Sequence, residues 1–116
     1  MIGGIHMTIE RGTTQEITVT IRGWDLTGCD IYVHFKQGSK AVTKKDMDSV
    51  AFTDNATKIV LTLTQQETMS FDNNRAGLVQ ARWIDSNGKA RKTKTAPFEV
   101  DELLYEAVLV KDDDGD

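Results

Sequence analysis

The residue types that most often carry chemistry are scarce in this sequence. Its 116 residues contain two histidines, His6 and His34, and a single cysteine, Cys29. Zinc sites use about four His or Cys ligands at short, regular spacings, and this chain has no such cluster. A thiol nucleophile needs a nearby base that a third group orients, and closeness in the sequence does not supply one. We therefore predict no metal site and no Cys–His nucleophile.

Carboxylates and glycines are also not arranged as in catalytic or cofactor-binding motifs. Residues 112–116 are calcium-like in composition but lack the alternating ligand spacing and the distal glutamate of an EF-hand loop. No Gly-rich phosphate loop, nucleophile elbow or dinucleotide fingerprint occurs. The sequence therefore predicts a protein that is not an enzyme and that needs no cofactor.

Charge is distributed unevenly along the chain. The net charge of −4 argues against a general nucleic-acid-binding role. Residues 75–94 nevertheless carry six basic residues and one acidic residue, whereas residues 99–116 carry eight acidic residues and one lysine. These two segments can pair within the domain or between neighbouring copies, or each can form a solvated face. No apolar run approaches the roughly 18 residues that would span a membrane.

Apolar and polar residues alternate with a period of two over much of the chain. Ile17, Val19 and Ile21 alternate with polar residues, and the same spacing recurs in residues 31–36, 59–64 and 79–84. Side chains two apart share one face of a strand, so each run has one face to bury. Turn residues separate the runs, which predicts an all-β, immunoglobulin-like antiparallel β-sandwich of about seven or eight strands. The predicted strands lie near residues 7–10, 15–22, 30–37, 40–45, 49–53, 58–64, 76–85 and 89–100.

One short helical turn is predicted near residues 64–70. Thr64 and Glu67 fit a capping box, in which the Thr hydroxyl accepts from a backbone N–H and the Glu side chain reaches back. The turn lies between two predicted strands, so we expect it to cross from one sheet to the other.

The segment around residues 85–88 is the strongest hairpin signal, because Asn87 and Gly88 suit the positive φ angles of a type I′ turn. A two-residue turn would pair Trp83 with Lys92 and Ala81 with Lys94, and a core face cannot accept two lysine ammonium groups. We therefore expect the hairpin tip to project past the sandwich, or a bulge to shift the register. The lone proline, Pro97, suits an edge or a bulge in the last strand.

The two tryptophans receive different predictions. Trp83 lies on the apolar face of a predicted central strand and is expected in the core. Trp24 lies in a loop, where it either plugs the end of the sandwich or is an exposed contact residue.

Beyond the last strand, residues 101–116 form a C-terminal extension. Its apolar residues keep a helical spacing, but residues 105–110 could equally extend as a strand. The acidic end is expected to be disordered because its charges repel one another. The apolar part needs a covering surface, which is either its own sandwich or another subunit.

Three stretches together resemble a known family: residues 9–14, 25–36 and 59–68, followed by a Gly-containing strand and an Asn-Gly-Lys hairpin. The chain resembles the small immunoglobulin-like proteins of Firmicutes prophage tail regions. It is also similar to the N-terminal domain of phage baseplate upper proteins. The similarity covers roughly residues 8–100, and its motifs mark turns and strand starts rather than catalytic groups.

The resemblance implies a virion structural protein that is assembled in the bacterial cytoplasm and holds neighbouring tail subunits. The implied partners are other phage tail or baseplate proteins and a further copy of the chain, with no nucleic acid and no membrane. No long region follows the sandwich, so a small accessory tail protein is expected rather than a complete baseplate arm. The alternative is a carbohydrate-binding immunoglobulin-like surface module with Trp24 and Tyr32 as stacking residues.

These expectations divide the chain into a flexible N-terminus at residues 1–7, a sandwich at 8–100 and an extension at 101–116 with a disordered acidic end. Partner contacts are expected at the basic hairpin, at the loop tryptophan and along the extension. The candidate contact residues are Trp24, Arg82, Lys89, Arg91, Lys92, Lys94, Leu103, Leu104, Tyr105 and Val108.

Overall fold

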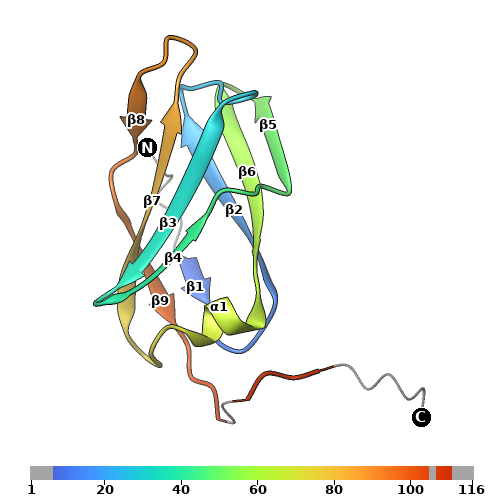
Figure 1. Cartoon of the computed structure of the whole chain (residues 1–116), viewed down its shortest axis with the longest axis vertical. Coiled ribbons are helices and arrows are strands. Elements are labelled where there is room, and N and C mark those ends of the chain that lie inside the picture. The colour runs from blue at the N-terminus through green and yellow to red at the C-terminus, as the bar shows by residue number, and fades with distance from the viewer. Residues whose placement is uncertain (1–6, 105–106, 111–116) are drawn as a thin grey trace, which may run out of the picture.

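The alternating runs fold into nine strands and one short helix within residues 7–104 and 107–110, which the computed structural model describes (Figure 1). This confirms the all-β class. One strand more than expected is present because the run predicted at 89–100 is interrupted at residues 93–95. The elements are β1 (Met7–Ile9), β2 (Gln15–Arg22), β3 (Asp30–Gln37), β4 (Lys40–Lys44), β5 (Ser49–Thr53), β6 (Ala56–Leu63), α1 (Gln65–Met69), β7 (Ala76–Ile84), β8 (Ala90–Lys92) and β9 (Ala96–Val100).

The strands form two sheets. The six-stranded sheet has the order β1-β9-β7-β3-β4, with β8 also pairing with β7, and the three-stranded sheet has the order β2-β6-β5. If β2 to β7 are taken as strands B, C, C′, D, E and F, and β8 with β9 as strand G, this is the immunoglobulin arrangement. One pair departs from the expected antiparallel pattern, because β1 runs parallel to β9 with Met7 opposite Phe98. Met7 therefore already belongs to the sandwich.

The inner faces of the two sheets form the core. Phe35 and Phe98 meet edge-to-face with their ring centroids 5.9 Å apart, and Phe71 meets Phe98 in the same way at 5.3 Å. Burying one such ring stabilises the fold by about 1.5–3 kcal/mol. Trp83, farther along β7, is also part of the buried core, as predicted. The rest of the buried apolar core is Ile9, Ile17, Val19, Ile21, Leu26, Ile31, Val33, Ala56, Ile59, Leu61, Leu63, Val79, Ala81 and Val100.

A glycine in β7 makes room for this aromatic cluster. A Cβ atom at Gly77 would lie 2.6 Å from the backbone oxygen of Lys36 on β3 and would collide with the ring of Phe98 on β9. Only a residue without a side chain lets the three adjacent strands pack this closely.

The helix α1 begins with the predicted capping box. Thr64 Oγ1 accepts a hydrogen bond from the Glu67 backbone N–H at 3.1 Å, and Glu67 Oε1 accepts one from the Thr64 N–H at 2.8 Å. The Lys44 ammonium donates to both oxygens of the same carboxylate, at 2.9 and 3.1 Å. The helix joins β6 of the smaller sheet to β7 of the larger one, so it crosses between the sheets as expected.

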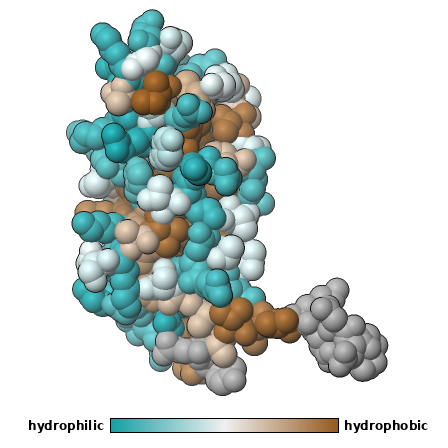
Figure 2. Space-filling view, viewed as in Figure 1, coloured by the Kyte–Doolittle hydropathy of each residue, from teal (hydrophilic) through white to brown (hydrophobic). Residues whose placement is uncertain are grey.

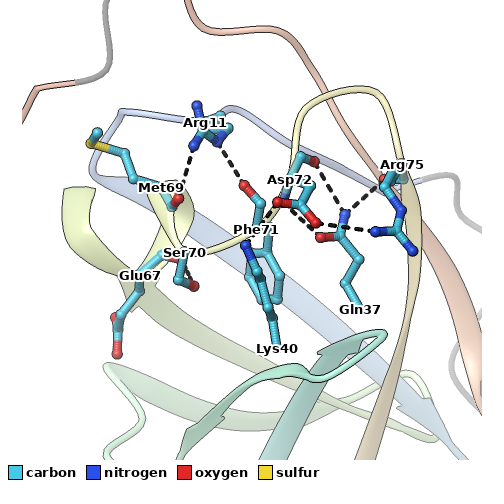
Figure 3. A network of polar contacts seen from close by, with 9 residues as sticks. All are labelled: Arg11, Gln37, Lys40, Glu67, Met69, Ser70, Phe71, Asp72 and Arg75. Atoms are coloured by element: carbon cyan, nitrogen blue, oxygen red, sulfur yellow. Dashed lines mark hydrogen bonds and ion pairs between the residues drawn. The ribbon is translucent and has the colours of Figure 1, made fainter.

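A buried amide fixes the loop between α1 and β7 (Figure 3). The Gln37 side chain, 2% exposed, accepts from the Asp72 N–H at 2.6 Å and donates to the carbonyl oxygens of Asp72 and Arg75. The Asp72 carboxylate in turn pairs with Lys40 at 2.7 Å and with Arg75 at 3.1 Å. Arg11, from the turn after β1, donates to the carbonyl oxygen of Phe71 at 2.6 Å. This end of the sandwich is therefore held by polar contacts between segments far apart in sequence.

Candidate docking surface

The basic hairpin of β7 and β8 has a three-residue loop at residues 86–88. The Gly88 N–H donates to the Asp85 oxygen at 2.9 Å, and Gly88 is the one residue of this loop with a positive φ, 78°. This geometry is a type I turn followed by a bulge at Gly88, so the predicted type I′ turn is wrong. The register shifts by one residue, and Trp83 faces Arg91 while Arg82 faces Lys92. We expected either a projecting hairpin tip or a bulge that shifts the register. The structure has the shifted register, and Lys92 is exposed to solvent.

A second bulge follows at residues 93–95. Arg82 is opposite Lys92 and Val79 is opposite Ala96, so three residues on this edge face two on β7. A bulge of this kind inserts one residue and changes which face the following side chains occupy. The inserted residue lets the basic half of the predicted strand 89–100 face solvent while the apolar half faces the core.

Thr93 anchors the second bulge. Its side chain is buried, its N–H donates to the Ala81 oxygen at 2.9 Å, and its Oγ1 accepts from the Ala81 N–H at 3.1 Å. Gln80 Nε2 donates to the Thr93 carbonyl oxygen at 2.9 Å. With Thr93 turned inward, Lys94 is exposed and Phe98 returns to the core.

These two bulges gather cations on the solvent side of the six-stranded sheet, which we call the outer face. Arg82 lies directly opposite Lys92 on one side and Tyr32 on the other. Like charges opposite each other on adjacent strands destabilise a sheet by a few tenths of a kcal/mol, up to about 1. The outer face consists of Lys36, Arg82 and Lys92 together with Tyr32, His34, Leu78, Gln80, Ile84 and Ala90, and we count with it Lys94, which is exposed in the adjoining bulge.

Large apolar side chains are exposed between the cations of the outer face. Tyr32, Leu78 and Ile84 have 39%, 49% and 41% of their surface accessible. Two shallow hollows lie there: one of about 480 Å³ beside Leu78 and one of about 300 Å³ between Tyr32 and Ile84. None of the four cations makes an ion pair with another residue of the described chain. The face therefore offers both apolar contact and uncompensated positive charge.

His34 lies at the centre of the outer face. Its Nδ1 is 3.0 Å from Thr43 Oγ1, and its ring stacks parallel to that of Tyr32 with centroids 6.5 Å apart. Burial and then the positive charge of Arg82 lower the pKa of His34 below its usual value. The neutral ring does not add to the positive charge of the face at neutral pH.

Trp24 lies apart from the outer face, at the end of the sandwich that carries the β2–β3 loop and the tip of the β7–β8 hairpin, which we call the loop end. Its ring meets Trp83 edge-to-face at 5.5 Å, and the Arg91 guanidinium lies over it at 5.4 Å. Arg91 Nε also donates to Asp85 Oδ2 at 3.0 Å. The ring is 38% exposed, so Trp24 combines the two predicted roles: it covers the core end and keeps a solvent-facing side.

The hairpin-tip acid Asp85 is ordered by its own loop. Its carboxylate accepts from the N–H groups of Lys89 and Asn87 and from Arg91, which together lower its pKa below the usual range. Lys89 itself is exposed at the tip. Arg91 and Lys89 therefore do not lie with Arg82, Lys92 and Lys94, although all five are close in sequence.

The C-terminal extension is fixed to the domain at its start. The Asp101 N–H donates to the Ile9 oxygen at 3.1 Å, and Asp101 Oδ1 accepts from the Arg11 N–H at 2.9 Å. The Leu103 N–H donates to Asn73 Oδ1 at 3.1 Å, and its side chain packs over Gly12, where a Cβ would lie 2.7 Å away. Leu103 is therefore half-buried in its own domain.

Further along, the described part of the extension contacts Gln65. The Gln65 side chain donates to the Leu109 carbonyl oxygen and accepts from the Leu109 N–H, both at 2.8 Å. Leu104 and Val108 are exposed, and the described part of the extension is neither helix nor strand. Tyr105 and the acidic residues 112–116 lie outside the described residues, as do residues 1–6.

Two properties of the described part of the chain bear on catalysis: the state of the lone cysteine and the placement of the metal-ligating residue types. Burial, followed by the nearby carboxylates of Asp25, Asp85 and Asp30, raises the pKa of the Cys29 thiol, which is the opposite of what a nucleophilic cysteine needs. Among residues 7–104 and 107–110, no three His, Cys, Asp or Glu side chains are grouped so that they could hold a metal ion. No helix in this part of the chain has the length and apolarity needed to span a membrane.

The candidate contact residues thus fall into separate places. Arg82, Lys92 and Lys94 share the outer face, whereas Trp24 and Arg91 lie at the loop end and Leu103 and Leu104 at the opposite end. The predicted contact residues did not include Lys36, Leu78 or Ile84. Their signal was present in the alternation, because each occupies the solvent-facing position next to a buried residue in β3 or β7.

Compared with known protein families and with curated proteins, the chain matches none.

Proposed function

We propose that this domain is a non-enzymatic structural module of a phage or prophage virion, associated with the tail or baseplate, that acts through protein–protein contacts. The class comes from the resemblance of residues 8–100 to immunoglobulin-like tail proteins. The contact surface is the outer face of the six-stranded sheet, and the chain is assembled into the virion in the bacterial cytoplasm.

One observation carries the assignment to protein contact. Arg82 and Lys92 lie directly opposite each other without an acidic partner among the described residues, beside the exposed ring of Tyr32. This like-charge pair is unfavourable in the isolated domain, and an acidic surface that covered it would turn it into a favourable contact. Exposed aromatic and arginine side chains are also the residue types that contribute most to protein interfaces.

Binding to neighbouring tail proteins tests the proposal. The proteins encoded beside this chain are purified and mixed with it, and complexes are detected by native mass spectrometry. We expect a complex that is lost when Arg82→Glu and Lys92→Glu are combined. It should be retained when Arg22→Glu and Lys58→Glu are combined, a matched double charge reversal on the exposed side of the other sheet. A chain that binds none of these proteins would contradict the proposal.

A carbohydrate-binding module is the second candidate. It is favoured by a hollow of about 290 Å³ between Trp24 and the 85–87 loop, in which a half-exposed indole ring could stack on a sugar. Tyr32 does not line this hollow, so the two rings do not form one platform. Changes in Trp24 fluorescence on adding bacterial cell-wall or surface polysaccharides, absent in Trp24→Ala, would support this alternative, and no change would exclude it.

A further inference from the structure

The C-terminal extension exposes a short apolar run that its own domain does not cover. Leu104 is 90% exposed, Leu109 66% and Val110 84%. Figure 2 shows this run as an apolar projection from the body of the molecule. Single exposed leucines are ordinary, but several close together mark a surface that is covered in an assembly.

The path of the extension leads away from the outer face of the same molecule. Its contacts run from Gly12 to Gln65, and Gln65 is the first residue of α1, the helix that follows β6 of the three-stranded sheet. In Figure 1 the extension leaves beyond α1, away from both sheets. To reach its own outer face it would have to release Gln65 and reverse direction, so a surface on another molecule is the simpler cover.

The charges of the two surfaces are complementary. Residues 101–116 contain seven acidic residues and one lysine. The outer face presents four cations that have no ion pair within the described chain, while its acidic neighbours Asp30 and Glu99 stand at its two ends. Its exposed Tyr32, Leu78 and Ile84 match the apolar run in chemistry. The outer face is thus complementary, in charge and in apolar contact, to an apolar segment flanked by acidic residues.

We propose that the C-terminal extension of one copy docks on the outer face of a second copy. This inference rests on the proposed function and deepens it by naming the chain itself as one partner. Because the extension and the outer face are different surfaces, the contact is head-to-tail, and repeating it produces a ring when the rotation closes or a filament when it does not.

Paired variants of the full chain test the contact. The face variant combines Arg82→Glu with Lys92→Glu, and the extension variant combines Leu109→Asp with Val110→Asp. All these side chains are exposed, so circular dichroism should show folded protein in each case. The matched control combines Arg22→Glu with Lys58→Glu. Sedimentation velocity over a concentration series, at low and at high salt, measures association.

The expected result is association of the wild type and of the control, which weakens at high salt, and loss of association in each variant alone. An equimolar mixture of the two variants should form a one-to-one heterodimer and nothing larger, because only one intact face and one intact extension remain. A wild type that stays monomeric, variants that associate as the wild type does, or a folded mixture that stays monomeric would each overturn the inference.

Failure of this inference is distinguishable from failure of the proposed function. A chain that stays monomeric but still binds the tail proteins encoded beside it would overturn self-docking alone. A monomer that binds none of them would overturn both.

Discussion

Arg91 lies over the ring of Trp24, with its guanidinium carbon 5.4 Å from the ring centroid. The Asp85 carboxylate holds the guanidinium in this position from the base of the hairpin. The contact joins the loop between β2 and β3 to the hairpin between β7 and β8, and it covers the end of the core beside Trp83. Two segments distant in sequence are thereby tied together at this end of the sandwich.

The first prediction concerns this contact. Arg91→Ala should lower the free energy of unfolding by about 1 kcal/mol, because a partly exposed cation–π contact and a surface ion pair are both lost. It should also make tryptophan fluorescence easier to quench with acrylamide, and the change reports on Trp24 because Trp83 is buried. Lys89→Ala, at the exposed tip of the same hairpin, serves as the control. Equal quenching in the two variants would show that Arg91 does not shield the ring.

The second prediction concerns the bulge at residues 93–95. Thr93→Val keeps the shape of the side chain but removes the acceptor of the buried Ala81 N–H, which should cost about 1–3 kcal/mol in urea unfolding. Thr95→Val makes the same chemical change at an exposed position and should cost much less. If the two variants were equally stable, the Thr93 hydroxyl would not be what holds the bulge.

The third prediction concerns the close approach at Gly77. Gly77→Ala should destabilise the domain by about 1–3 kcal/mol, because the added methyl group overlaps the Phe98 ring and the Lys36 carbonyl oxygen. Thermal unfolding measures the effect. In a Phe98→Leu background, Gly77→Ala should still cost part of this free energy, since the backbone of β3 cannot move away as a side chain can. If Gly77→Ala cost nothing in that background, the ring alone would cause the strain.

The fourth prediction concerns acid stability. Burial tends to raise the pKa of Glu67, but hydrogen bonds from Thr64 and Lys44 outweigh it and lower the pKa below the ordinary 4.5. A carboxyl with a depressed pKa stabilises the folded state above its unfolded pKa, and this stability is lost as the pH falls through the folded pKa. Stability should therefore decline as the pH drops below about 4.5.

Glu67→Gln should flatten part of this decline in urea unfolding measured over a series of pH values. The amide can still cap the helix but cannot pair with Lys44, so we expect a loss of about 1 kcal/mol at neutral pH. Some pH dependence should remain, because Lys40 holds the pKa of Asp72 below its usual value in the same way. Glu16→Gln, at an exposed position on β2, controls for the change in net charge, and an identical pH profile in both variants would refute the role of Glu67.

Much of the fold follows from local patterns in the sequence. The alternation in residues 15–22 and 30–37 specifies both strands to the residue, since each has one apolar face to bury. The Thr64 and Glu67 pair likewise specifies the start of α1, because a capping box depends only on residues three apart.

The parts that were missed depend on contacts between distant segments. The bulge at residues 93–95 has no compositional signature, and Thr93 is recognisable as its anchor only once Ala81 is beside it. The burial of Gln37 requires the loop at Asp72, and the parallel pairing of β1 requires β9 to end where it does. The outer face, which is assembled from β3, β7 and β8, could not be recognised before the register of the hairpin was known.

The two bulges of the last hairpin have a consequence for how this protein can change. Each bulge adds one residue to one strand of a pair. The residues after it therefore exchange sides, so that positions which would have faced solvent face the core, until the next bulge restores the first pattern. Before the second bulge the odd-numbered residues lie on the core side of the sheet: Arg91 is opposite Trp83, and Thr93 is buried. After it the even-numbered residues do, since Phe98 and Val100 are buried. A single-residue deletion at Gly88 or within residues 93–95 would act on this edge like a frameshift, exchanging lysines for core residues. Length changes here should therefore be tolerated only in compensating pairs, although single substitutions at the exposed positions cost little.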